Sequence, residues 1–198
     1  MPFKAIVRLE TDIVIYLPNL LTLGRIALVP FLIVLLQDKQ FLWSLLVFLV
    51  AGVSDALDGY LAKRFDARTQ LGAILDPLAD KALILSAYIT LSVLLLIPFW
   101  LVVVVVFRDV IIIVGYLIMT LFFGSIEMKP LMISKLNTFT QIVYILIVLG
   151  VLAGAALLAD VVPVLAIVVL VTSVCSGAAY VYIWSVKAMK SPDDIVAK

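Results

Sequence analysis

Six long apolar segments limit what this 198-residue sequence can fold into. They lie at 17–36, 41–62, 72–97, 99–123, 135–157 and 161–186. Each is close to the length of about 20 apolar residues that an α-helix needs to cross a bilayer. Hydrophobic residues make up 66% of the chain and charged residues only 14%, whereas soluble domains average about 45–50% and 25%. We therefore predict an all-α, polytopic membrane protein with six transmembrane helices.

The two ends of the chain are more polar than its middle. Residues 1–16 mix four charged residues with apolar ones, a pattern typical of an amphipathic segment in the membrane interface. Residues 191–198 are short and polar. The predicted organisation is an amphipathic juxtamembrane segment at 1–16, a six-helix domain at 17–190 and a polar tail at 191–198.

Lysine and arginine are distributed unequally between the segments that join the predicted helices. If the N-terminus lies in the cytoplasm, the outer loops contain only Lys39. This asymmetry predicts that both termini face the cytoplasm. No transit peptide is visible, so a bacterial plasma membrane is the expected location. The inner cations are Lys4, Arg8, Lys63, Arg64, Arg68, Lys129, Lys135, Lys187, Lys190 and Lys198.

Three small residues in the apolar segments are interpreted as packing residues. Cys175 is the only cysteine, so a disulfide framework is excluded and we expect a small buried hydrophobic residue there. Gly150 and Gly154 form a small-xxx-small pair, which predicts close packing between helices.

The sequence contains no histidine, and its net charge is only +1. Imidazole bases, histidine triads and imidazole metal ligands are therefore excluded, so carboxylates must perform any acid, base or metal-binding role. The small net charge gives no indication of a nucleic-acid partner.

Four aspartates lie where apolar residues are expected. Asp55 and Asp58 are three positions apart, and Asp76 and Asp80 are four apart, so each pair shares one face of a helix. A carboxylate near the middle of a membrane span costs about 2.5–3.5 kcal/mol, so four would cost about 10 kcal/mol. Such a cost indicates a functional site at the ends of the second and third segments.

Divalent cations are the simplest way to keep four neighbouring carboxylates ionised. Oxygen ligands alone favour Mg²⁺ or Mn²⁺, and two such ions can clamp a phosphate during its transfer. A cation-channel filter, a proton relay or a cation-coupled transporter is the alternative from a different functional class. Gly59, Ala62 and Gly72 leave the helix surfaces bare for a bulky ligand, although packing alone explains any one of them.

The acidic run resembles the signature of the CDP-alcohol phosphatidyltransferase family. Its pattern is Asp55-x2-Asp58-Gly59-x2-Ala62-Lys63-x8-Gly72-x3-Asp76-x3-Asp80. Lys63 departs from the family pattern, in which arginine is usual at this position, and Arg64 follows directly. The charge survives, but a lysine cannot make the planar two-point contact of an arginine.

The resemblance implies a fold of six helices, two divalent metals and a homodimer. It implies that Asp55, Asp58 and Asp76 hold the metals, and that Asp80 lies beside them as ligand and general base. It further implies that Pro18-Asn19-x2-Thr22-x2-Arg25 approaches the diphosphate of a CDP-diacylglycerol donor; a helix cap and a snorkelling arginine are the alternative. The expected donor-binding residues are Asn19, Thr22, Arg25, Gly59, Ala62, Lys63, Arg64, Arg68 and Gly72.

The acceptor is predicted from the second half of the chain. Arg108 and Lys135 are expected to bind the acceptor phosphate, although Arg108 could instead pair with a neighbouring acid. No second arginine follows Arg108 in its helix, and Asn137 stands where a further lysine is expected for glycerol 3-phosphate. The pattern is similar to family members that form cardiolipin from phosphatidylglycerol. Phosphatidylglycerophosphate synthases, which use glycerol 3-phosphate, are the alternative.

Overall fold

A computed structural model describes residues 23–65, 70–123 and 131–189, with residues 55–65, 70–78, 123 and 188 described by backbone alone. All regular structure in these ranges is helical, as predicted. After a first helix, Leu23–Gln37, the elements are α2 (Phe41–Phe65), α3 (Gln70–Val93), α4 (Phe99–Phe123), α5 (Met132–Leu152), the short 3₁₀ turn η1 (Ala156–Leu158) and α6 (Val161–Ala188).

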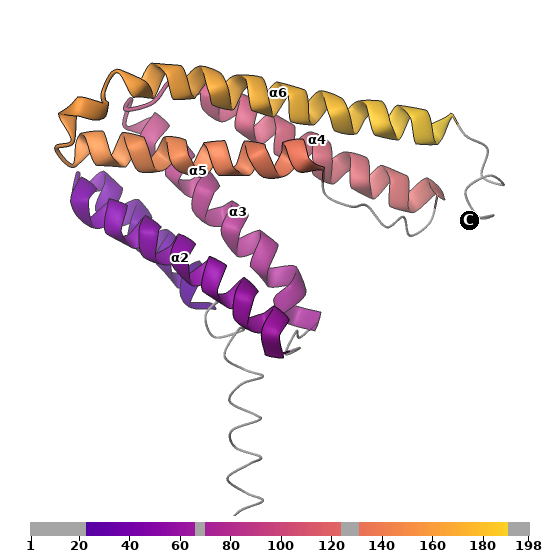
Figure 1. The fold of residues 1–198 in the computed structure, drawn as a ribbon, viewed down its shortest axis with the longest axis horizontal. Helices are drawn as coiled ribbons and strands as arrows, with labels where there is room; N and C mark the ends of the chain where they lie inside the picture. Colours follow the sequence, from indigo (N-terminus) through magenta and orange to yellow (C-terminus); the bar gives the residue numbers. More distant parts are fainter. Residues whose placement is uncertain (1–22, 66–69, 124–130, 190–198) are drawn as a thin grey trace, which may run out of the picture.

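The last three helices pack along one another and form one side of the molecule (Figure 1). α6 contacts both α4 and α5, while α2 packs against α5. α3 runs obliquely to the last three helices and contacts both α4 and α5. Residues of α5 thus share a cavity with Val53 of α2 and Asp80 of α3.

Three of the described helices are long and apolar enough to cross a membrane, namely α4, α5 and α6. Large apolar side chains such as Phe107, Ile113 and Leu121 are exposed on α4, as expected for a surface in contact with lipid. The described parts of the first two helices, 23–37 and 41–54, are apolar but shorter. The structure therefore indicates an integral membrane protein, and the count of six spans stays a prediction.

An apolar core contains residues from the first helix and from α2 to α6. Tyr88 of α3 and Tyr144 of α5 stack with ring centroids 5.9 Å apart and planes at 21°. The Tyr88 hydroxyl donates a hydrogen bond to the backbone oxygen of Gln141 at 3.3 Å. Both rings are fully buried among residues of α2, α4 and α6. The ring pair packs α3 against α5.

Two helices end before their apolar segments do. α3 ends at Val93, and Leu95 has a left-handed backbone with φ 59°. α5 ends at Leu152, and Gly154 has φ 115°. The amide of Ala155 then donates to the oxygen of Gly150 at 2.9 Å, a hydrogen bond typical of a helix C-terminus. Hydropathy cannot detect these turns because the turn residues are themselves apolar.

The predicted packing roles of Gly150, Gly154 and Cys175 are wrong. Among the described residues, a Cβ added at either glycine would meet no atom within 4 Å, so no described helix packs closely against either one. Gly154 instead supplies the left-handed turn after α5. Cys175 is exposed on α6, because it lies on a face of that helix that no described helix covers.

Gly115 is the glycine that packing requires. The ring of Trp184 on α6 lies so close to α4 that a Cβ at Gly115 would be 1.9 Å from Cζ3. We expect Gly115→Ala to destabilise the protein by about 1–3 kcal/mol, because the indole must leave its place beside Tyr180 and Met119. Thermal unfolding in detergent measures the change. Gly150→Ala is the matched control, and Trp184→Leu should rescue the variant; failure of that rescue would contradict the steric explanation.

Candidate active site

A cavity of about 350 Å³ lies between α2, α3 and α5. Its wall is apolar except for Thr138 and Asp80, and Asp80 is the charged residue among its described lining. The other lining residues are Phe48, Leu49, Ala51, Gly52, Val53, Leu83, Ile84, Ile142 and Leu146. An apolar space with a carboxylate in its wall suits a ligand that is part hydrocarbon and part polar.

Asp80 forms an ion pair with Arg25, and the Nη1 of Arg25 donates to Oδ1 of Asp80. The Arg25 side chain is 1% exposed, whereas that of Asp80 is 37% exposed. The ion pair thus joins the first helix to α3, and its two residues are 55 positions apart in the sequence. The structure brings together the predicted catalytic residue and one predicted donor-binding residue, and leaves part of the carboxylate accessible.

The other predicted metal ligands are placed by backbone alone. Asp55 and Asp58 lie on α2, two and five positions after Val53, which lines the cavity of Asp80. Asp76 lies one turn before Asp80 on α3. The oxygen-only donor set and the shared location fit a divalent cation. The side chains of Asp55, Asp58, Asp76, Gly59, Ala62, Lys63, Arg64 and Gly72, and the whole of Asn19, Thr22 and Arg68, lie outside the described residues.

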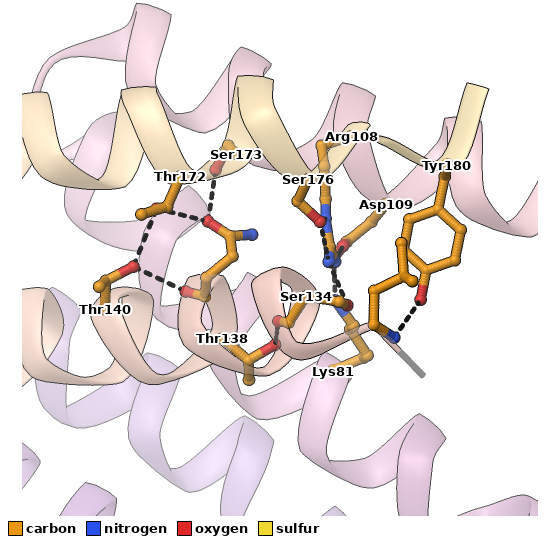
Figure 2. Close-up of polar contacts among 12 residues, drawn as sticks. Lys81, Arg108, Asp109, Ser134, Thr138, Thr140, Thr172, Ser173, Ser176 and Tyr180 are labelled. Carbon is orange, nitrogen blue, oxygen red and sulfur yellow. Dashed lines mark hydrogen bonds and ion pairs between the residues drawn. The ribbon is translucent and has the colours of Figure 1, made fainter. Parts of the chain in front are cut away.

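Arg108 lies buried at the junction of α4, α5 and α6 (Figure 2). Its Nη1 donates to Oδ1 of Asp109 at 2.7 Å, and its Nη2 donates to Ser176 at 2.8 Å and also to Ser134. The pairing with a neighbouring acid, which the sequence left open, therefore exists. The same guanidinium also joins α4 to α5 and α6.

Lys81 extends this cluster to α3. Its Nζ donates to Oδ2 of Asp109 at 2.5 Å, so each oxygen of that carboxylate receives one cation. Asp109 and Lys81 were not among the predicted site residues. The available signal was a pair of charged residues inside the otherwise apolar α4, because such residues in a membrane span need nearby partners.

Lys135 lines a shallow depression on α5 with Ser134, Thr138, Phe139 and Ile142. Thr138 and Ile142 also line the cavity of Asp80, so the depression adjoins that cavity. Lys135 is exposed, and its neighbour Ser134 accepts the hydrogen bond from Arg108. The structure thus places Lys135 between the two polar regions without joining it directly to Arg108.

Asn137, at the position where a further lysine was considered, links two helices. Its Oδ1 accepts hydrogen bonds from Thr172 and Ser173 of α6, both at 2.9 Å. In the same network, the hydroxyl groups of Thr140 and Thr172 form a hydrogen bond with 3.1 Å between their Oγ1 atoms (Figure 2). The side chain is fully buried. This position therefore contributes to helix packing and adds no positive charge to the acceptor region.

Several curated proteins are similar in sequence to this chain. The cardiolipin synthase (CMP-forming) of Streptomyces coelicolor is 39% identical to it over 113 residues, which cover 54% of this chain and 53% of the relative. The enzyme of the same name from Rattus norvegicus is 37% identical over 145 residues, covering 65% and 48%. A CDP-diacylglycerol–glycerol-3-phosphate 3-phosphatidyltransferase of Salmonella choleraesuis is 42% identical over 80 residues, covering 38% and 43%. The chain spans about half the length of the curated relatives it matches.

The match to a family model covers most of the chain. The model describes the CDP-alcohol phosphatidyltransferases and aligns with residues 15–176. The match includes the acidic segments of α2 and α3, the Arg25–Asp80 pair and the cluster around Arg108. It confirms the resemblance based on the aspartate pattern. The chain belongs to the CDP-alcohol phosphatidyltransferase family.

Proposed function

We propose that this protein transfers the phosphatidyl group of CDP-diacylglycerol to phosphatidylglycerol, forming cardiolipin and releasing CMP. The observation that carries the proposal is the position of Asp80, whose accessible carboxylate borders an apolar cavity between α2, α3 and α5. Hydrocarbon chains fit the apolar wall, while the reacting polar groups lie at the carboxylate. The relatives from Streptomyces coelicolor and Rattus norvegicus are named cardiolipin synthases (CMP-forming), which supports cardiolipin as the product.

Asp55, Asp58, Asp76 and Asp80 would hold two divalent ions, Mg²⁺ or Mn²⁺. When bound, these ions would neutralise charge on the phosphate oxygens. The donor set supports this proposal, since carboxylates from two neighbouring helices supply oxygen ligands without imidazole or thiolate. The ion pair between Arg25 and Asp80 supports an ionised carboxylate at position 80.

Asp80 acts as the general base. Its carboxylate accepts the proton of the acceptor hydroxyl as the hydroxyl oxygen attacks the phosphorus that bears diacylglycerol. The new oxygen–phosphorus bond forms as the bond between that phosphorus and the CMP oxygen breaks, and CMP leaves with the electron pair. The accessible part of the Asp80 carboxylate leaves room for the hydroxyl beside Arg25.

The remaining predicted site residues divide between donor and acceptor. Arg25 contacts the donor diphosphate together with Asn19, Thr22, Gly59, Ala62, Lys63, Arg64, Arg68 and Gly72. Arg108 and Lys135 bind the acceptor phosphate. The proximity of the Lys135 depression to the cavity of Asp80 supports this division, since the two share Thr138 and Ile142.

The proposed setting is a bacterial plasma membrane with six transmembrane helices. Both termini and the active site lie on the cytoplasmic side, where CMP can leave into water. The six-helix catalytic domain extends over 17–190, between the interfacial segment 1–16 and the polar tail 191–198. The protein works as a homodimer.

Glycerol 3-phosphate is the second candidate acceptor. The Salmonella relative, which is named for glycerol 3-phosphate, is 42% identical to this chain over 80 residues. That match covers only 38% of this chain, so it supports this acceptor less than the longer matches support phosphatidylglycerol. A cation-coupled transporter has no support from the family match.

CMP release by the purified full-length chain tests the proposal. With CDP-diacylglycerol and Mg²⁺, we expect CMP only when phosphatidylglycerol is added, and EDTA should abolish the release because the aspartates need a divalent ion. Restoring Mg²⁺ or Mn²⁺ should restore activity. Release with glycerol 3-phosphate alone would refute the proposed acceptor, and metal-dependent cation flux without CMP release would refute the enzymatic proposal.

A further inference from the structure

Asp109 connects two cations that reach it from different helices. Oδ1 accepts from Arg108 at 2.7 Å, and Oδ2 accepts from Lys81 at 2.5 Å (Figure 2). A carboxylate has two acceptor oxygens, so one side chain can hold two cationic groups side by side. The geometry therefore brings an ammonium from α3 and a guanidinium from α4 to one point.

The cluster contains more positive than negative charge. Lys81 and Arg108 contribute two positive charges, and Asp109 contributes one negative charge. The other described partners of Arg108 are the neutral hydroxyls of Ser134 and Ser176. Among the described contacts, the cluster thus carries a net charge of +1, and apolar surroundings make a compensating anion favourable.

Accessibility decides from which side an anion can approach. The side chains of Arg108 and Asp109 are 5% and 13% exposed, whereas that of Lys81 is 39% exposed. Lys81 is therefore the most accessible side chain of the cluster, while Arg108 also lines a separate cavity between α4 and α6. Lys81 directly follows Asp80 on α3, so adjacent residues of one helix serve the cluster and the cavity.

We propose that Asp109 is a positioning residue that holds Lys81 and Arg108 together as a two-cation site for the phosphodiester of the acceptor lipid. This inference rests on the proposed function and adds Lys81 and Asp109 to it. A phosphodiester has one negative charge, which neutralises the net charge of the cluster.

Kinetics with purified full-length variants test the positioning role. At saturating CDP-diacylglycerol, Asp109→Asn and Lys81→Met should each raise KM for phosphatidylglycerol about ten-fold or more, since a charged hydrogen bond is lost or misdirected. The KM for CDP-diacylglycerol should stay within about two-fold. The double variant should resemble either single variant, because both residues act through one site. Asp160→Asn, an exposed aspartate at the start of α6, is the matched control and should leave both KM values unchanged.

A different pattern would overturn the proposal. If Asp109→Asn lowers kcat but leaves KM for phosphatidylglycerol unchanged, or raises both KM values in parallel, Asp109 serves only to pack the helices. A second measurement does not need turnover: phosphatidylglycerol should raise the thermal midpoint of the wild-type chain more than uncharged diacylglycerol does. This difference should disappear in Asp109→Asn and Lys81→Met.

The binding measurement separates failure of the inference from failure of the proposed function. If the wild-type chain releases no CMP but shows the difference between lipids, and both variants lose it, the proposed reaction is wrong and the phosphodiester site stands. The wild-type chain could instead release CMP with phosphatidylglycerol while both lipids raise its thermal midpoint equally. That result would refute the two-cation site and leave the proposed reaction standing.

Discussion

Asp80→Asn is expected to lower CMP release by about 100- to 10,000-fold, the range that positioned general bases contribute. The amide retains the shape of the carboxylate but cannot accept a proton at neutral pH. It also removes an anionic ligand from the proposed metal site. Initial rates with saturating CDP-diacylglycerol and phosphatidylglycerol, normalised to folded monodisperse protein, measure the loss.

The control for Asp80→Asn is Asp38→Asn, which removes an exposed carboxylate from the turn after the first helix. It should retain wild-type activity. Because Asp80 also pairs with Arg25, the thermal midpoint of each variant must be measured beside its rate. An Asp80→Asn protein that is folded and retains more than about a tenth of the wild-type rate is incompatible with Asp80 as the general base.

Arg108→Met is expected to destabilise the protein by about 3–5 kcal/mol, as removal of one partner from a buried ion pair commonly does. The methionine would leave Asp109 with only one of its two described cations, and would leave Ser134 and Ser176 without the guanidinium that joins them. A large fall in the thermal midpoint and in the yield of monodisperse protein should follow.

Two comparison variants make the Arg108 result interpretable. Arg108→Lys keeps the charge but loses the planar guanidinium that contacts Asp109 and both serines, so its midpoint should lie between those of Arg108→Met and the wild type. Lys39→Gln removes an exposed loop cation and should leave the midpoint unchanged. A wild-type midpoint for Arg108→Met would show that the buried cluster does not stabilise the junction of α4, α5 and α6.

The positions of most helices could be predicted from hydropathy because helix formation in an apolar environment depends on local sequence. α4 agrees with its predicted segment at both ends. α3 and α5 end earlier, because Leu95 and Gly154 adopt left-handed backbones inside apolar runs. The buried cysteine and the glycine packing pair were mispredicted because residue type does not show which face of a helix another helix will cover.

The residue types of the candidate site could be predicted from the sequence, but most contacts between them could not. Asp80 and Arg25 were both identified from the sequence, yet their ion pair joins residues 55 positions apart. The bridge from Lys81 to Arg108 through Asp109 depends on three side chains from two helices. No periodicity in one helix specifies such contacts, because they require a particular rotation and separation of its neighbours.

The sequence by itself determined that the chain is helical and apolar, and that its acidic residues occur in pairs spaced to share a helix face. Those properties follow from local composition and from the period of the α-helix. Only the tertiary structure decided that Asp80 borders an apolar cavity, that Arg25 pairs with it and that Asp109 holds two cations. The physical reason is that each of these contacts joins segments distant in the chain, and the packing of whole helices against one another determines which side chains meet.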